Sequence, residues 1–465
     1  MNKIKRNIVC HNDTKQAEIY QGVLPFSLPA IENKKITVDF NGPSQSSDGG
    51  VLLMSELADQ IKIIEQISGC ITDVRDERYT LHELNVLLAQ RIYQIALGYE
   101  DANDSDHLRH DPALKMALGV LPDSGKALAS QPTITRLENA VSRRDLYRIG
   151  EVFVDYFMDS YVSEPEIIVL DFDDTESTTY GGQQLSLFNN YYGGYCYMPL
   201  HVYEGLSGKL ITTILKPGKR SSGEQVLSIL KRLVNTMRQR WPNTIMVFRG
   251  DSHFCAPDIH QWIGSEENAY HVTGLSGNCK LYKQVEGKRK VARKLFEESG
   301  RKVTLFHSFA YKAGSWSEDQ RVVAKIEYGE KGANIRFIAT DMHHAKAGVL
   351  FREIYNARGC DELYIKEHKL YLKSDRTSCN RFEANQFRLF LHSAAYVLMH
   401  SLRENLLPTS QLAKATFQTI RLKLFKVGTH IQEMRTKIKV HFPKSYPYQN
   451  IFRQSCEILA YLRGP

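Results

Sequence analysis

Residues 355–369, YNARGCDELYIKEHK, bring together several side chains that could do chemistry. On an α-helix with about 100° per residue, five polar side chains of this stretch fall within roughly 80° of one another. These are Tyr355, Arg358, Glu362, Lys366 and Lys369. A helix packed on the flanking Leu363 and Ile365 would turn a carboxylate, several cations and a phenol toward a cleft. The stripe also fits a solvent-exposed helix, because Glu362 and Lys366 form an i,i+4 pair of opposite charge.

Two more carboxylates stand where apolar strands are predicted to end. The apolar run from residue 167 reaches Asp173, and the run from residue 244 reaches Asp251. With Glu362, these acids make the set that a two-metal phosphoryl-transfer site needs, since carboxylates hold Mg²⁺ and the ions clamp the attacking and leaving oxygens. Asp171 shares a strand face with Asp173, and we select Asp173 because it lies nearer the strand end. Taken alone, each acid is equally well explained as a cap or turn former.

The elements that must position these acids follow a recognisable order. We predict strands at residues 167–173, 197–203, 210–215, 244–251 and 270–275, with a helix over 223–240 and a shorter helix before the fifth strand. Strand, hairpin, helix, strand, helix, strand is the order of a ribonuclease H-like core, in which the first and fourth strands are neighbours, about 4.8 Å apart. We therefore predict an α+β or α/β fold whose mixed sheet brings Asp173 and Asp251 into one site.

The rest of the chain is predicted to divide around this core. We expect an N-terminal arm over 1–48, a helical DNA-binding domain over 49–162, the catalytic core over 163–277 and 343–405, a β-rich basic insertion over 278–342 and a basic C-terminal region over 406–465. Alternating residues predict strands at 35–40 and 437–442, and Gly98 is expected to end a helix. A very apolar helix over 387–402 has the length to cover the sheet. The helices of the front third are equally well explained by packing alone.

Composition and charge limit the partners and the cellular compartment that we expect for this chain. The chain has 465 residues and a net charge of +8, which permits a polyanionic partner. Nine basic residues face three acidic ones between Lys280 and Lys302, where Lys288, Arg289 and Lys290 form either a phosphate-contacting patch or a solvated loop. Eight scattered cysteines without a C-x-x-C pair favour a reducing compartment over a zinc ribbon or a disulfide framework. No signal peptide and no membrane-spanning run is seen, so we expect a cytoplasmic protein without a membrane partner.

Several motifs resemble those of a known family. The spacing Y-x2-R-x3-E-x6-K over 355–369 is similar to the signature of IS4-like DDE transposases, and Asp173-Asp174-Thr175 resembles their first acidic box. A closer resemblance is to the IS1380 family of insertion-sequence transposases. It includes LDFDDT at 170–175, GGQQLSLFN at 181–189, PGK at 217–219, DRTSC at 375–379, GYED at 98–101 and LRHDP at 108–112. The resemblance runs from about residue 48 to beyond residue 402.

The resemblance implies a DNA-cutting and DNA-joining enzyme. Such a protein binds the terminal inverted repeats of its own element as double-stranded DNA, cleaves at the ends and transfers the strands to target DNA. By resemblance, Asp173, Asp251 and Glu362 would coordinate Mg²⁺, for which Mn²⁺ can substitute. Tyr355, Arg358 and Lys369 would contact phosphates beside the cut, with Arg358 suited to a bidentate grip. A homodimer is expected in the DNA complex, because two ends with one site each take two protomers.

Two other functions fit the same residues. Residues 171–175, DFDDT, also match the nucleophile box of haloacid dehalogenase-like phosphatases, in which Asp171 would accept the phosphoryl group. Against this, Cys255 stands where a further acid is expected, and a hairpin after the first strand does not suit a doubly wound parallel sheet. A domesticated or inactive DNA-binding derivative is the second alternative, and the presence of all three carboxylates counts against it.

Overall fold

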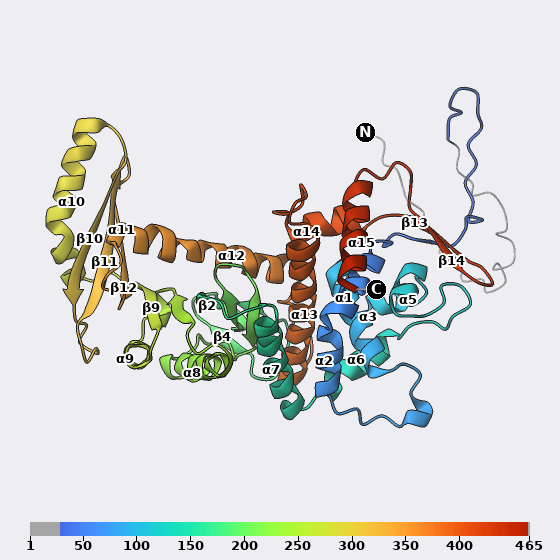
Figure 1. The fold of residues 1–465 in the computed structure, drawn as a ribbon, viewed down its shortest axis with the longest axis horizontal. Coiled ribbons are helices and arrows are strands. Elements are labelled where there is room, and N and C mark those ends of the chain that lie inside the picture. The colour runs from blue at the N-terminus through green and yellow to red at the C-terminus, as the bar shows by residue number, and fades with distance from the viewer. Residues whose placement is uncertain (1–27, 464–465) are drawn as a thin grey trace, which may run out of the picture.

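The computed structural model describes residues 28–463, apart from the side chain of Asp361. The molecule is elongated, with a large sheet on one side and a helical region on the other, and the long helix α13 (Phe382–Leu406) stands between them (Figure 1). Residues 1–27 of the predicted N-terminal arm and the last two residues of the C-terminal region lie outside the described residues. Among the described helices, none is both long and apolar enough to cross a membrane.

Eight strands form the large mixed sheet, in the order β10-β11-β12-β9-β8-β2-β6-β7. The strands are β2 (Ile167–Asp174), β6 (Leu200–Glu204), β7 (Leu210–Ile214), β8 (Ile245–Gly250), β9 (Ala269–Leu275), β10 (Val303–Tyr311), β11 (Gln320–Gly329) and β12 (Gly332–Thr340). β2 pairs in parallel with β8 and antiparallel with β6, and β6 pairs antiparallel with β7. The predicted hairpin and the predicted adjacency of the first and fourth core strands are therefore confirmed.

The period-two alternation of β2 decides which residues face which helix layer. Ile168, Leu170 and Phe172 pack with the helices α7 (Arg143–Asp159), α8 (Gly223–Arg240) and α9 (Pro257–Ser265). Val169 packs on the other side, in a cluster with Leu350 and Phe351. Asp171 and Asp173 share the side of Val169, so the strand turns both acids toward the segment that contains Leu350.

That segment is a continuous but irregular helix over residues 347–371, which we call the irregular helix. It consists of α11 (Ala347–Val349), a π-helical part Leu350–Tyr355, a 3₁₀ turn Asn356–Arg358, α12 (Gly359–Lys366) and a second π-helical part Glu367–Tyr371. In Figure 1 it runs from the insertion strands across the sheet toward α13. The regular α-helix predicted over residues 355–369 is therefore only partly correct, because the winding changes three times within these residues.

The insertion differs from the prediction at its start. α10 (Cys279–Ser299) is a helix of 21 residues, which the residue pattern did not predict. It packs through Leu281, Val285 and Ala292 on the strands β10 to β12. β12 pairs with β9, and β11 and β10 follow it in the strand order, so the insertion extends the main sheet instead of forming a separate one.

The front third is helical, as predicted. Its helices are α1 (Val51–Ile61), α2 (Ile63–Cys70), α3 (Leu84–Leu97), α4 (Asp104–Leu108), α5 (Pro112–Ala117), α6 (Gln131–Ala140) and α7. α3 ends at Gly98, whose φ of 94° suits a residue without a Cβ atom. α13 contacts the edge strand β7 and also packs against α3, α6 and α7. It thus joins the sheet to the helical region, whereas its apolar sequence predicted a helix that covers the sheet.

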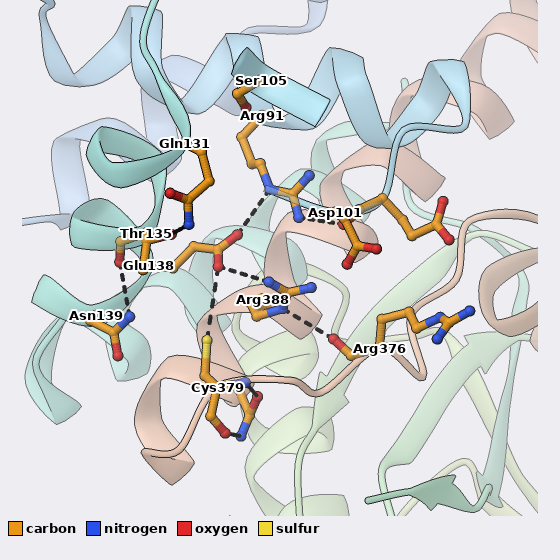
Figure 2. A network of polar contacts seen from close by, with 12 residues as sticks. Arg91, Asp101, Ser105, Gln131, Thr135, Glu138, Asn139, Arg376, Cys379 and Arg388 are labelled. Atoms are coloured by element: carbon orange, nitrogen blue, oxygen red, sulfur yellow. Dashed lines mark hydrogen bonds and ion pairs between the residues drawn. The ribbon is translucent and has the colours of Figure 1, made fainter. Parts of the chain in front are cut away.

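A buried ionic network connects α13 to the helices α3 and α6 of the helical region (Figure 2). Glu138 of α6 accepts from Arg91 of α3 at 2.9 Å and from Arg388 of α13 at 2.8 Å. Arg388 also donates to the carbonyl of Arg376 in the loop before α13. Burial acts to raise the pKa of Glu138, but the charges of Arg388 and Arg91 outweigh it, so that this pKa lies below its usual value. Three helices far apart in the sequence are therefore joined by one carboxylate.

The C-terminal region packs beside the first described elements of the chain. It contains α14 (Phe417–Ile420), β13 (Thr429–Glu433), β14 (Ile438–His441) and α15 (Gln449–Arg463). β13 pairs with β1 (Gln45–Ser46), and β14 confirms the strand predicted near residue 440. The strand predicted at residues 35–40 is wrong, because these residues form no ladder with another strand.

Candidate active site

The parallel pairing of β2 and β8 places two of the predicted acids at one edge of the sheet. The register pairs Phe172 with Gly250, so Asp173 and Asp251 each follow the same rung of the ladder. Asp251 leads into a short turn, where its carboxylate accepts from the backbone N–H of His253 at 2.8 Å. Burial is the main cause that raises the pKa of Asp173, and the charge of Asp251 raises it further. The structure thus brings these two residues together as the strand pattern predicted.

Asp173 lies in a crowded and acidic environment. Its carboxylate accepts from Arg358 of the irregular helix at 2.9 Å, and the two side chains are only 16% and 15% exposed. The pKa of Asp173 is raised to about 7, chiefly by burial. The charge of Arg358 lowers this pKa, whereas the charges of Asp251, Asp174 and Glu362 raise it. A proton or a cation at this carboxylate is therefore favoured, because burial and the neighbouring acids disfavour its uncompensated negative charge.

Asp174, the next residue, is held by partners that the sequence pattern did not reveal. Lys216 donates to its carboxylate at 2.7 Å, and the backbone N–H of Ser221 donates to its other oxygen at 2.9 Å. The ring of His253 contacts the carbonyl of Ser221 at 2.7 Å. Lys216 follows an ordinary apolar strand pattern, so nothing in the local sequence pointed to this role.

The irregular helix supplies two more of the predicted residues. The hydroxyl of Tyr355 lies beside Gly274 and the backbone of Asp251, since a Cβ atom built on Gly274 would be 2.6 Å from that oxygen and 3.2 Å from the Asp251 carbonyl carbon. Burial raises the pKa of Tyr355. Lys369 donates to the carboxylate of Glu176 at 3.1 Å, and also to the carbonyl of that residue.

Glu362 reaches this region less directly. It is exposed on α12, and its charge acts on Asp173. Leu363, which flanks the polar stripe and on which the helix was expected to pack, is 58% exposed, so that part of the prediction is wrong. Ile365 is partly buried against the main core cluster, as expected. The polar stripe therefore survives at Tyr355, Arg358 and Lys369 but turns outward at Glu362.

The fit of a metal ion can be judged from these donors. Among the described residues, no three His, Cys, Asp or Glu side chains are grouped closely enough to hold an ion. The chemistry of the donors nevertheless suits a divalent cation. Burial and then the charges of neighbouring carboxylates raise the pKa of Asp173, and a cation would relieve the repulsion among these carboxylates. Arg358 provides part of that positive charge in this arrangement.

Asp171 has a different environment from Asp173. It is 1% exposed, and both of its carboxylate oxygens accept from the guanidinium of Arg249 on β8. A nucleophile for phosphate monoesters must reach its substrate, and this carboxylate is covered and paired. The structure therefore counts against the phosphatase alternative.

The basic patch of the insertion lies elsewhere. Lys288, Arg289 and Lys290 are exposed on α10, which packs on the insertion strands at the outer end of the sheet (Figure 1). Arg289 pairs with Glu286 of the same helix at 2.8 Å. The alternative of a solvated loop is therefore wrong, because these residues lie on a helix, and the structure does not bring these cations beside Asp173.

Comparison with known proteins gives a family match over nearly the whole chain and a similar solved structure. The family model described as "Transposase DDE domain group 1" matches residues 28–464. No curated protein matches the chain. Among solved structures, the cryo-EM structure of the piggyBac transposase synaptic complex with hairpin DNA is similar over 91% of this chain and 86% of that chain, with 11% sequence identity and a TM-score of 0.43.

Proposed function

Since the chain belongs to the family of group 1 DDE transposase domains, we propose that it mobilises an insertion sequence of the IS1380 type. In this proposal the protein binds the terminal inverted repeats of its element, cleaves the DNA at both ends and transfers the strands to target DNA. Two ends with one site per chain require two protomers, so the DNA complex would contain a homodimer.

The observation that carries the proposal is the meeting of Asp173, Asp251 and the irregular helix at one sheet edge. The strand order β7-β6-β2-β8-β9, with β2, β8 and β9 parallel and β6 and β7 antiparallel, supports a ribonuclease H-like core. In such a core the ends of β2 and β8 form the natural place for paired carboxylates. Arg358 and Tyr355 approach the same edge from the covering helix.

Asp173, Asp251 and Glu362 would hold the divalent metal ions that transposases of this family generally use, here Mg²⁺ with Mn²⁺ as a substitute. Bound metal supplies Lewis-acid charge at the phosphate and lowers the pKa of the attacking water. Lys216 and Ser221 hold the neighbouring Asp174 in place, which leaves Asp173 as the acid directed at the irregular helix. Glu362 would approach from α12, where it is exposed and can reorient.

The DNA backbone would be held by the cations of the irregular helix. Arg358 presents a planar guanidinium suited to a bidentate phosphate contact, and Lys369 and Tyr355 lie along the same helix. Arg358 and Lys369 now pair with Asp173 and Glu176, so a phosphate would exchange for these carboxylates. The exposed Lys288, Arg289 and Lys290 would contact DNA farther from the cut, with the steep salt dependence of phosphate binding.

The experiment that tests this proposal is cleavage of a labelled duplex that carries the end of the element, with Mg²⁺. The intact protein is compared with Glu362→Gln and with Glu353→Gln, a matched control at an exposed glutamate of the same irregular helix. We expect cleavage by the intact protein and the control, and binding without cleavage by Glu362→Gln.

The other outcomes identify the alternatives. Binding without cleavage by all three proteins would favour an inactive DNA-binding derivative. If none of them binds DNA and the intact protein hydrolyses a phosphate monoester in an Asp171-dependent reaction, the phosphatase function replaces the proposal.

A further inference from the structure

A small hairpin beside the candidate site exposes an unusual number of aromatic rings. It is formed by β4 (Leu187–Asn189) and β5 (Gly194–Tyr197), and β5 also pairs with β3 (Ser177–Thr178). We call residues 187–197 the tyrosine hairpin. Phe188, Tyr191, Tyr192 and Tyr195 are 52%, 78%, 43% and 58% exposed. Exposure of four large aromatic rings to water at one short hairpin is unfavourable in free energy. An exposed apolar patch of this kind indicates a binding surface.

The rings are fixed in place by the hairpin itself. The side chain of Asn189 accepts from the backbone N–H of Tyr191 at 3.0 Å and donates to the carbonyl of Gly218 at 3.0 Å. The ring centroids of Tyr191 and Tyr192 are 4.9 Å apart, and those of Phe188 and Tyr195 are 5.5 Å apart, both edge to face. Because the turn and the ring pairs are already ordered, a flat ligand could bind without first ordering this surface.

Positive charge stands directly beside the rings. The guanidinium of Arg220 lies 5.3 Å from the centroid of Tyr191, and it also acts to lower the pKa of Tyr192, which burial raises overall. Both Arg220 and Lys219 are exposed. An apolar partner protein would not use these cations, whereas a nucleic acid offers bases for the rings and phosphates for the charges.

The hairpin is connected to the candidate site by short links. Arg220 precedes Ser221, whose backbone N–H binds Asp174, the neighbour of Asp173. On the other side, β3 follows β2 after two residues, and Glu176 between them binds Lys369. A strand that enters the candidate site would therefore pass close to the tyrosine hairpin.

We propose that the tyrosine hairpin binds unpaired bases of the DNA strand next to the cut, by stacking on Tyr191 and Tyr192, with Arg220 on the adjoining phosphate. This inference rests on the proposed function, because it assumes that DNA is cut at Asp173 and Asp251. Stacking on aromatic side chains tolerates any base sequence, since every base has a π face. The hairpin would thus hold opened DNA at the site and leave sequence recognition to other parts of the chain.

The test compares two labelled duplexes that carry the element end. One is fully paired, and the other has a bubble of about four unpaired nucleotides beside the cut, within the site size of a stacking surface. 2-Aminopurine in the bubble reports stacking through its fluorescence. Affinities are measured for the intact protein, for Tyr191→Ala/Tyr192→Ala and for Tyr191→Phe/Tyr192→Phe. Tyr461→Ala is the matched control, because Tyr461 is 86% exposed on α15 in the distant C-terminal region.

We expect the intact protein, the Phe variant and the control to bind the bubble more tightly than the paired duplex and to quench 2-aminopurine. The Ala variant should lose roughly 5-fold or more in affinity for the bubble and little for the paired duplex. An Ala variant that keeps the preference for the bubble, or that loses affinity equally for both duplexes, overturns the inference. If the intact protein binds neither duplex, the proposed function itself has failed.

Discussion

The buried network of Arg91, Glu138 and Arg388 gives a prediction whose size can be worked out from the structure. Glu138 is 1% exposed and uses both carboxylate oxygens, at 2.9 Å and 2.8 Å, for two guanidinium groups that are themselves buried. Glu138→Gln keeps the shape of the side chain but removes the charge between two buried cations. Breaking a buried ion pair from one side costs about 3–5 kcal/mol, and screening by water does not reduce this at a fully covered site.

The matched control is Glu383→Gln. Glu383 also pairs with one arginine at 2.8 Å, but that partner, Arg143, is 83% exposed. An exposed pair contributes about 0–1 kcal/mol, so this variant should unfold close to the intact protein. The assay is urea unfolding followed by far-UV circular dichroism, with Glu138→Asp as a milder variant that retains the charge. If Glu138→Gln loses no more stability than Glu383→Gln, the reasoning about this network is refuted.

Burial, close packing and the proposed metal requirement each lead to a further prediction. Burial lowers the pKa of several histidines, to about 3, 4 and 3 for His201, His271 and His400. The unfolded chain therefore takes up protons first, and stability should fall as the pH drops below about 6.5, by about 1.4 kcal/mol per pH unit for each such group; urea midpoints that rise with acid would contradict this. Gly274→Ala should cost about 1–3 kcal/mol, because its Cβ atom would lie 2.6 Å from the Tyr355 hydroxyl, whereas the control Gly264→Ala meets nothing within 4 Å; equal unfolding midpoints for the two variants would count against the close packing. Removal of divalent metal with EDTA should stop cleavage of the element end and leave DNA binding, and cleavage that persists in EDTA would exclude the proposed metal requirement.

Much of the sheet could be predicted because each of the predicted strands is indicated by the residue pattern of its own short stretch of sequence. The apolar runs that end at Asp173 and Asp251 have the length and composition of buried strands, and they became β2 and β8. α8 occupies the predicted residues from Gly223 to Arg240, because Ser222 caps its first turn and the apolar residues repeat every three or four positions. Local pattern and global fold agree at these elements.

The contacts that form the candidate site and the buried network could not be predicted from local residue patterns. Arg358 and Asp173 are 185 residues apart in the sequence, and Glu138 and Arg388 are 250 residues apart. α10 was missed because its buried face has few apolar residues among many charges. Pairings of this kind depend on which elements meet in three dimensions, and the spacing of residues within one element does not reveal them.

The irregular helix shows how winding, and not motif spacing alone, sets the site. A regular α-helix would have placed Tyr355, Arg358, Glu362 and Lys369 on one face, but each residue added to a turn by π-helical winding rotates the later residues by about 100° relative to that pattern. The observed winding keeps Arg358 on Asp173 and exposes both Glu362 and Leu363. A change of winding before Arg358 would therefore move Arg358 and Glu362, the proposed third carboxylate, together. The cleavage comparison of Glu362→Gln with Glu353→Gln tests whether Glu362 supplies that carboxylate, because Glu353 is also exposed but precedes Arg358 on the same helix.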